Sequence, residues 1–589
     1  MHSLGKRLLG VGAAGVLIAV SAAVPTSASA VGAGSAAAKD QADTVSALER
    51  KRVDSVPTPK LDWYECWETA ECATTRLPLD YDQPTGAKTE IAVLRIKAKD
   101  QAHKIGTLFV NPGGPGGSAT SFAYSAQFFL SESILKRFDI VGFDPRGIDA
   151  SQNLRCFPSV KEQTAVLSQM NVAFPWGKAQ EDRYIAAAKK FGKACSTTGK
   201  WLAGSMSSAE AARDMDVLRR AVGDQKLSFL GFSYGTAIGQ FYANMFPDRF
   251  RALTVDGVLD PEHWVGTPAT AGQEQDTRLR SGAGAYRALI EILHRCDAAG
   301  EEFCVFAAGD PVKNFETIAQ TLRKKPLVLK DEWGTWTITY ADFVSGILGS
   351  MYGTDAGDWA TYLMMDLWNM LFPPTQEAAD EARTALLARI KEARGKPARD
   401  FYYSNGFEAF AGVDCTDALH PQDAGDWPAL MVQADKRAPY FGRAWGWGTV
   451  QCARNTWTVR DEDAYTGPWT AKTAAPVLFV GAKWDPATNY DDAVSASKRL
   501  PNSRLLSNTN WGHTSYGTSD CATNAIDTYL LTGALPAKGT WCDGDYQPFT
   551  TPVVSEEEQE TMTLSEARKE QGLPDVSRPA PYSIFNSQS

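Results

Sequence analysis

The fold is decided by one segment, Lys226-Leu-Ser-Phe-Leu-Gly-Phe-Ser233-Tyr-Gly-Thr-Ala-Ile-Gly-Gln-Phe-Tyr-Ala-Asn-Met245. Its apolar residues 227–230 suffice for a buried strand, and a helix-like run follows Gly235. The Gly-x-Ser-x-Gly between them is typical, in this context, of a nucleophile elbow. Such a tight turn needs glycine beside Ser233 and lifts its hydroxyl to a helix N-terminus, where an oxyanion is favoured. We therefore interpret Ser233 as a nucleophile rather than as part of a structural Gly-Ser turn.

Short apolar runs on both sides of this segment predict further strands. They lie at residues 89–96, 106–110, 138–143, 250–258, 475–481 and 503–507. Helical spacing over residues 181–193 and 207–222 separates some of them, and Ser207-Ser-Ala-Glu210 resembles a capping box. Strands that alternate with helices indicate a mostly parallel sheet with helices on both faces, an α/β fold.

This alternation stops between residues 262 and 472, where the spacing is mainly helical. The helical stretches are 282–295, 312–322, 340–351, 359–371 and 376–394. We therefore expect a large, mainly helical cap insertion at residues 262–472. The core then comprises residues 54–261 and 473–550, followed by a polar, acidic tail at 551–589.

The N-terminus has the pattern of a secretory signal peptide. Lys6 and Arg7 precede an apolar run, and Ala28-Ser-Ala30 offers a small-residue cleavage site. We expect residues 1–30 to be removed on secretion, rather than kept as an anchor helix, and residues 31–53 to form a flexible leader or pro-segment. No later stretch is apolar enough to span a bilayer, so no membrane association is expected after cleavage.

Composition bounds the partners and cofactors. The net charge of −10 argues against nucleic acid as a partner. In an exported chain, ten cysteines predict complete disulfide pairing, although their spacing leaves the connectivity open. Proximity favours Cys66–Cys72, Cys156–Cys195, Cys296–Cys304, Cys415–Cys452 and Cys521–Cys542. Because no Cys-x2-Cys pair occurs, no metal is expected, and the serine mechanism inferred below needs no organic cofactor.

A second glycine-rich segment, Asn111-Pro-Gly-Gly-Pro-Gly-Gly-Ser118, follows the strand at 106–110. It lacks the Gly-Lys-Ser/Thr ending of a phosphate-binding loop. Beside a nucleophile elbow, an oxyanion loop is the better interpretation, because glycines let a backbone N–H approach the substrate carbonyl. We expect the N–H groups of Gly114 and Tyr234 to form the oxyanion hole.

A serine nucleophile needs a base and an acid, in the chain order Ser, Asp or Glu, then His. Of the histidines after the signal peptide, only His513 lies beyond the resumed sheet, so the order selects it as the base. Asp485, just after the strand at 475–481, is the preferred acid, with Asp256 as its competitor. We expect Asp144 and Arg146, after another strand, to brace neighbouring loops rather than to react.

These motifs together resemble a known family. The segments Asn111–Gly117, Asp144-Pro-Arg-Gly147 and Gly231–Thr236, with Asp485 and His513, resemble the secreted α/β-hydrolase peptidases of the prolyl aminopeptidase family. The likeness, from about Leu61 to Cys542, is greatest to the actinomycete tripeptidyl aminopeptidases. It implies an α/β-hydrolase fold with a helical cap and release of tripeptides from free N-termini of peptides or proteins. Pro112 stands where prolyl aminopeptidases have the histidine of His-Gly-Gly-Pro, which argues against strict proline specificity.

An aminopeptidase must bind a charged α-amine, for which buried carboxylates are the physical means. The candidates, in and beside the insertion, are Glu262, Glu274, Asp414 and Asp417. Three alternatives stay open at this point: a prolyl aminopeptidase, a secreted esterase or lipase of the same fold, and a non-catalytic binding protein on the same scaffold. An esterase predicts an apolar cap, and the Trp- and Met-rich residues 351–371 keep that alternative open. The sequence leaves the oligomeric state open.

Overall fold

The computed structural model describes residues 45–332, 334–394 and 403–553. The predicted signal peptide, residues 31–44 of the predicted leader and residues 554–589 of the predicted tail lie outside these ranges. Within them, no helix has the length and apolar character needed to cross a bilayer.

A ten-stranded sheet forms the centre of the core, in the order β1-β2-β3-β5-β4-β6-β7-β10-β11-β12. Its first four strands pair antiparallel, and the pairs from β5–β4 to β11–β12 are parallel. The strands are β1 (Tyr64–Cys66), β2 (Ala70–Pro78), β3 (Lys88–Ile96), β4 (Gly106–Asn111), β5 (Phe138–Phe143), β6 (Leu227–Phe232), β7 (Phe250–Asp256), β10 (Val477–Trp484), β11 (Ser503–Trp511) and β12 (Trp541–Cys542). The predicted α/β-hydrolase class is confirmed.

Helices cover both faces of the sheet, as the apolar strands require, because a strand such as β4 is buried on both sides. One face carries α2 (Ala119–Ala126), α3 (Glu132–Arg137) and α20 (Asp520–Thr532). The other carries α7 (Ser208–Ala221), α8 (Gly235–Met245) and α19 (Tyr490–Arg499). A 3-10 turn, η1 (Gln101–His103), precedes β4. Ser207 caps α7 by accepting the Glu210 N–H, but the Glu210 side chain turns to arginines, so the predicted capping box is only half formed.

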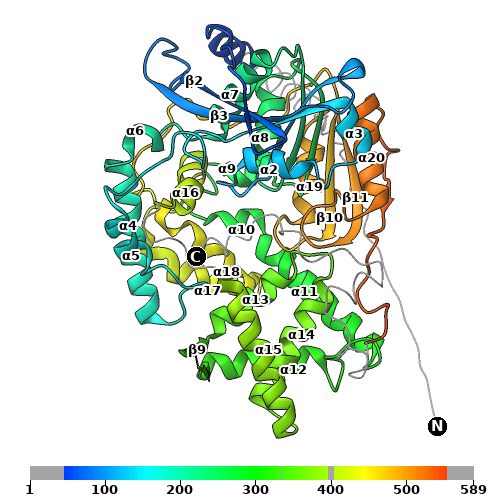
Figure 1. Ribbon diagram of the computed structural model, residues 1–589. Coiled ribbons are helices and arrows are strands. Elements are labelled where there is room, and N and C mark those ends of the chain that lie inside the picture. The colour runs from blue at the N-terminus through cyan, green and yellow to red at the C-terminus, as the bar shows by residue number, and fades with distance from the viewer. Residues whose placement is uncertain (1–44, 333, 395–402, 554–589) are drawn as a thin grey trace, which may run out of the picture.

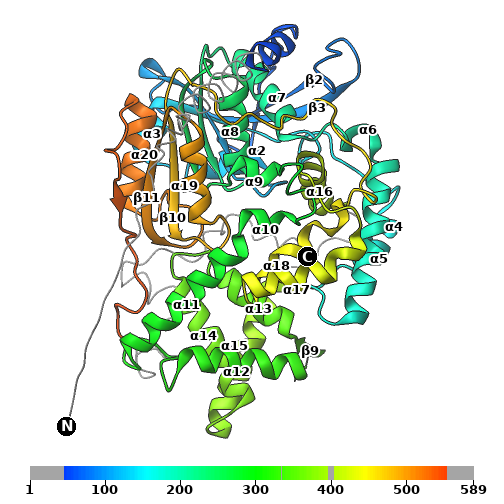
Figure 2. The ribbon, with the colours of Figure 1, turned by 180° about the vertical axis from the view of Figure 1, so that it is seen from behind.

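Most of the cap lies between β7 and β10, below the sheet in Figures 1 and 2. Its helices are α9 (Pro261–Val265), α10 (Gln275–Leu279), α11 (Ser281–Ala299), α12 (Pro311–Lys324), α13 (Tyr340–Ser350), α14 (Ala356–Leu371), α15 (Gln376–Arg394), α16 (Gly406–Asp417), α17 (Trp427–Arg437) and α18 (Phe441–Gly446). Two 3-10 turns, η2 (Ala424–Asp426) and η3 (Trp447–Cys452), and the hairpin β8 (Leu327–Asp331)–β9 (Gly334–Ile338) complete it.

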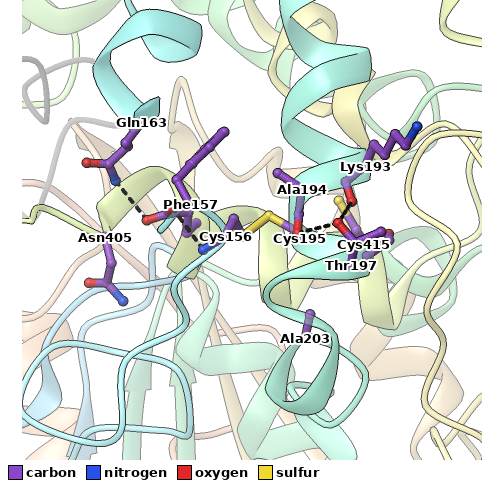
Figure 3. The surroundings of a disulfide bond; sticks show 12 residues. Cys156, Phe157, Gln163, Lys193, Ala194, Cys195, Thr197, Ala203, Asn405 and Cys415 are labelled. Atoms are coloured by element: carbon purple, nitrogen blue, oxygen red, sulfur yellow. Dashed lines mark hydrogen bonds between the residues drawn. A yellow bond between two sulfur atoms is a disulfide. The ribbon is translucent and has the colours of Figure 1, made fainter. Parts of the chain in front are cut away.

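A second segment, between β5 and α7, also joins the cap. It contains α4 (Val160–Leu167), α5 (Lys178–Thr197) and α6 (Lys200–Ala203), and α4 and α5 lie beside α16–α18 in both views. Tyr184 of α5 packs against Trp447 of η3, with ring centroids 5.5 Å apart. The Cys156–Cys195 disulfide fastens α5 to the chain before α4 (Figure 3). The segment expected to lie wholly in the core, residues 54–261, therefore also contributes these helices to the cap.

The flexible leader predicted for residues 31–53 is wrong for its last part. Residues 45–54 form a helix, in which Val53 is fully buried. Glu49, also buried, accepts hydrogen bonds from Arg213 Nε at 2.7 Å and Nη2 at 3.0 Å, which ties this helix to α7. Glu49, one of the charged residues that suggested a flexible leader, instead forms a buried ion pair.

The five disulfides join the cysteine pairs favoured by proximity, and the described residues contain no free cysteine. Cys66–Cys72 closes the β1–β2 turn, while Cys415–Cys452 joins α16 to η3 within the cap. The last bond, Cys521–Cys542, holds β12 to α20 at the edge of the core.

Replacing Glu49 with Ala should lower the free energy of unfolding by about 3 kcal/mol, because the buried Arg213 guanidinium loses one carboxylate. Chemical denaturation of the mature protein measures this. The control is Arg50→Ala, which removes an exposed ion pair with Asp248 and should cost about 0.5 kcal/mol or less. Equal effects of the two changes would show that the 45–54 helix is not held by its buried pair.

Candidate active site

Ser233 occupies the strained turn between β6 and α8. Its φ is +54°, a left-handed value that is costly for a residue with a side chain. The turn admits no side chain at Gly235, where an added Cβ would lie 2.7 Å from the Asn111 carbonyl oxygen. Ser233 N–H donates to the Asp256 carbonyl at 3.0 Å, and Thr236 Oγ donates to the Ser233 carbonyl. These contacts hold a partly exposed hydroxyl at the N-terminus of α8.

The glycine-rich loop after β4 lies directly against this turn. At Gly113, whose φ is +93°, a Cβ would meet Phe232 O, Tyr234 N and Ser233 Cβ within 2.8 Å. The Gly113 N–H donates to Asn111 Oδ1. By contrast, neither the Gly114 nor the Tyr234 N–H donates a hydrogen bond within the described residues. Both N–H groups are therefore available as donors for the predicted oxyanion hole.

His513 follows β11 and contacts Asp485, which follows β10. Its Nδ1 lies 2.8 Å from Asp485 Oδ2. Asp485 also accepts the Ala487 and Thr488 N–H groups, each at 2.8 Å. Burial alone would raise the pKa of Asp485, but the facing His513 and these donors hold it below its usual value. An ionised carboxylate at Nδ1 keeps the proton on that nitrogen and leaves Nε2 to accept one.

The serine and the histidine approach each other across the end of β7. Asp256 bonds to Ser233 N–H, and the next residue, Gly257, lies against His513: a Cβ added there would be 3.2 Å from His513 Cε1. Within the described residues, no hydrogen bond joins Ser233 Oγ to His513. Catalytic hydrogen bonds are often loose without substrate, so the lack of this bond is compatible with His513 as the predicted base.

The other strand-end acids brace loops. Asp256 accepts the N–H groups of Ser515 and Tyr516 beside His513, and its burial raises its pKa to about 6. Asp144 accepts N–H and hydroxyl donors of Thr120, after the glycine-rich loop. Arg146 is buried and pairs with Asp214 and Glu210. None of these three contacts the serine side chain or the histidine ring through a hydrogen bond in the described structure.

The cap also contacts the histidine loop. His513 N–H donates to the Tyr352 carbonyl at 2.9 Å, and the two rings meet edge to face with centroids 5.5 Å apart. Gly512 lies against Gly353, the next residue of the same cap turn. The turn between α13 and α14 thus supports the base.

Two of the four acids considered for amine binding have partners that occupy them. Glu262 is 38% exposed at its side chain and pairs with Arg499 at 2.8 Å. Asp417 is buried, but its carboxylate accepts hydrogen bonds from Ser208 N, Ser208 Oγ and Trp264 Nε1. The Glu262 carboxylate is therefore paired with an arginine, and the Asp417 carboxylate connects α16 to Ser208 and Trp264.

The other two acids lie in a buried group of charges beside the elbow. Asp414 is fully buried, and its Oδ1 has no partner within ordinary hydrogen-bond geometry, although the Gln275 side chain acts on the carboxylate. Glu274 is 1% exposed and caps α10 through the Asp276 and Thr277 N–H groups. Burial raises the pKa of both, that of Asp414 to about 7. Both carboxylates act on Arg278, whose pKa burial nevertheless lowers to about 10.

Nearby residues link this group to the nucleophile elbow. Trp264 packs on Tyr234 with ring centroids 5.3 Å apart, and its carbonyl accepts from Gln275 and Arg278. Trp264, Ser208 and Tyr352 were absent from our sequence-based site. Ser208 lies in the segment predicted to begin a helix, but no local sequence pattern indicated that its hydroxyl would contact the nucleophile elbow.

Three groups of side chains place metal-ligand atoms close together in the described residues. They are Asp414 with His420 and Cys452, Asp80 with Asp82 and Asp463, and Glu210 with Asp461 and Asp463. Cys452 is in a disulfide and offers no thiolate, and burial lowers the pKa of His420 to about 3. The two acidic groups already pair with arginines 52, 146 and 213. We assign no metal to any of them.

Comparisons with known proteins give two family-model matches and several related sequences. The family model described as alpha/beta hydrolase fold matches residues 106–284, and the one described as TAP-like protein matches residues 438–542. A tripeptidyl aminopeptidase of Streptomyces coelicolor is 29% identical, over 84% of this chain and 87% of the relative. Carboxylesterase B of Mycobacterium tuberculosis is 29% identical (83% and 91% covered), and serine protease Hip1 of Mycobacterium tuberculosis is 28% identical (80% and 87%). A solved hydrolase from Pseudomonas aeruginosa is 14% identical, with a TM-score of 0.30, and covers 76% of this chain and 95% of that one.

The fold defines an α/β-hydrolase, and the relatives place the chain among the serine hydrolases of that class. Within that class the chain is similar to relatives named tripeptidyl aminopeptidase, from Streptomyces, and to the TAP-like family model. The resemblance inferred from the motifs is thereby confirmed.

Asp485→Asn should lower the rate of ester hydrolysis about 10⁴-fold, because the amide no longer fixes the tautomer of His513. Stopped-flow or steady-state hydrolysis of an activated acetyl ester measures it. Asp256→Asn is the matched control, since Asp256 touches only the backbone of the same loop, and its loss should be far smaller. Equal losses of activity in the two variants would contradict the assignment of Asp485 as the acid that acts on His513.

Proposed function

We propose that this protein is a secreted serine exopeptidase that releases short peptides, in the simplest case tripeptides, from the free N-termini of peptides and proteins. The proposal rests chiefly on one observation: buried carboxylates in the cap, above all Asp414 with its unpartnered oxygen, lie beside the elbow that carries Ser233. Secretion accords with the signal-peptide pattern and the five disulfides.

In the proposed reaction, His513 Nε2 takes the proton of Ser233 Oγ as this oxygen attacks the scissile carbonyl carbon. The resulting oxyanion accepts hydrogen bonds from the Gly114 and Tyr234 N–H groups. When the C–N bond breaks, His513 gives its proton to the departing amine, which leaves an acyl-enzyme on Ser233. Water then attacks the acyl carbon while His513 accepts its proton; the bond between the acyl carbon and Ser233 Oγ breaks, His513 returns the proton to Oγ, and the peptide leaves as a free acid. The steps use only groups of this chain and water.

Amine recognition follows from the charge balance around Asp414. Asp414 and its neighbours Asp417, Glu274 and Asp276 are acids, whereas Arg278 is the cation that acts on Asp414 and Glu274. His420 stays neutral because burial and Arg278 lower its pKa. A substrate ammonium would supply a second positive charge and donate to Asp414 Oδ1. Of the four acids considered at first, we therefore retain Asp414 for this role, because Glu274, like Asp417, already accepts three hydrogen bonds, from the Asp276 N–H, the Thr277 N–H and the Thr277 hydroxyl.

One relative is named Carboxylesterase B, so a general esterase is the competing function. An esterase needs the serine and its base but gains nothing from a cluster of buried acids. Such groups are costly to bury without a cationic partner, so their presence favours an amine-binding site.

The deciding assay compares a chromogenic tripeptide with a free amine, its N-acetylated twin and a short-chain ester, each with wild type and Ser233→Ala. We expect the free-amine peptide to be cleaved roughly 10- to 100-fold faster than the acetylated one, since acetylation removes a charged hydrogen bond worth roughly 1.5–3 kcal/mol. Ser233→Ala should abolish the cleavage. Equal or better turnover of the acetylated peptide or of the ester would instead establish a general serine hydrolase.

Asp414→Asn should raise KM for the free-amine tripeptide at least tenfold and leave hydrolysis of the short ester unchanged, because the ester has no ammonium group. Glu262→Gln is the matched control, since its carboxylate faces Arg499, and both kinetic constants should stay at the wild-type values. A loss with Glu262→Gln but not with Asp414→Asn would overturn the assignment.

The same site predicts a difference in pH dependence between the two substrates. The pKa of Asp414 in the free enzyme is raised to about 7, so the ionised, amine-binding form is lost as the pH falls through 7. The kcat/KM for the peptide should therefore decline more steeply below pH 7 than that for the ester, which has no ammonium group for Asp414 to bind. Parallel profiles for the two substrates would contradict this role.

A further inference from the structure

Asp417 connects the cap to the nucleophile elbow through buried hydrogen bonds. It is the last residue of α16 and is 5% exposed. Its carboxylate accepts the Ser208 N–H at 2.6 Å, the Ser208 hydroxyl, and Trp264 Nε1 at 2.8 Å. One cap side chain thereby holds the first residue of α7 and the middle of α9.

Both partners of Asp417 hold the side chain of Tyr234. Ser208 Oγ lies 2.7 Å from Tyr234 Oη, and because the serine proton is donated to Asp417, the tyrosine hydroxyl donates to Ser208 Oγ. On its other side, the Tyr234 ring packs against the Trp264 indole. Tyr234 is 2% exposed, so its side chain is enclosed by groups that Asp417 orients.

The backbone of Tyr234 carries one of the two free N–H groups beside Ser233. It follows a residue at φ +54°, a conformation that neighbouring contacts must maintain. A donor contributes to oxyanion stabilisation only when it points at the place where the charge develops. Fixing the Tyr234 side chain is therefore a means of fixing the direction of its N–H.

We propose that Asp417 is a positioning residue of the oxyanion hole, which acts through Ser208 and Trp264 on Tyr234. An ionised carboxylate accepts all three hydrogen bonds, whereas an amide in its place sets an N–H donor against another donor. The inference rests on Ser233 as the nucleophile of the proposed function, and it is independent of amine recognition.

The test uses Tyr234→Phe, which keeps the backbone N–H and the ring but removes the link to Ser208. Tyr242→Phe is the matched control, because Tyr242 lies on the same helix and its buried hydroxyl donates to Asp216 at 2.8 Å, away from the cap. Asp417→Asn and the double variant Asp417→Asn/Tyr234→Phe complete the set. Thermal melts of every variant separate stability from catalysis.

The readouts are hydrolysis of an activated acetyl ester and inhibition by an alkyl boronate, whose tetrahedral anion occupies the oxyanion hole. Complete loss of one donor costs about 10²–10³ in rate, so a misdirected donor should lower kcat about tenfold with little change in KM. The inhibition constant of the boronate should rise by the same factor. Tyr242→Phe should leave both values within about twofold of wild type, and the double variant should be no worse than Asp417→Asn alone, as expected for one shared pathway.

Equal effects of Tyr234→Phe and Tyr242→Phe, or additive losses in the double variant, would overturn the inference. If Asp417→Asn fails to fold, Ser208→Ala replaces it in the cycle, because it removes the same link without touching the carboxylate. A fluorophosphonate that labels Ser233 separates the two proposals. Labelling without cleavage of free-amine peptides would refute the aminopeptidase while the oxyanion test still holds, and absence of labelling at Ser233 would refute both.

Discussion

The left-handed backbone of Ser233 is the constraint on which the rest of the structure depends. A residue with a side chain adopts this conformation only when its neighbours fix it. Here β6 and α8 meet at so sharp an angle that Gly235 touches the Asn111 backbone, and Gly113 touches the residues on both sides of Ser233. The glycine-rich loop and the elbow therefore fit together as one unit, and the free N–H groups of Gly114 and Tyr234 result from that fit.

The parallel sheet brings the other groups to the same edge. Strands β6, β7, β10 and β11 run side by side in one direction, so the residues after them, Ser233, Asp256, Asp485 and His513, all emerge at their carboxyl ends. The positions of β7 and β10 in the sheet then give the two aspartates different contacts. Asp256 reaches the backbone after His513, while Asp485 reaches the ring itself. One acid shapes the loop and the other sets the state of the imidazole.

The features of the fold that depend on local sequence patterns, or on the order of motifs along the chain, can be predicted from the sequence. The elbow, the strands and the cap helices α11–α15 follow from spacing, and the even cysteine count with close neighbours indicates the disulfide pairs. Contacts between distant segments leave no such pattern. Glu49 meets Arg213 and Asp417 meets Ser208 across more than 160 residues of chain, and each of the four carries a charge or hydroxyl that is equally common at a surface. The bracing position of Asp417 and the placement of α4–α6 in the cap were therefore beyond sequence reasoning.

The cap is fastened to the catalytic loops on both sides of the site. Asp417 reaches the elbow through Ser208, and the Tyr352 carbonyl holds the backbone of His513. The helix that carries Asp417 also carries Asp414, the group that we propose for the substrate amine. Because α16 carries both Asp414 and Asp417, one turn apart, any shift of this helix that alters the amine site also moves the support of Tyr234. We therefore expect substitutions that displace α16 to alter kcat together with KM, whereas Asp414→Asn, which removes a charge without displacing the helix, should alter KM alone.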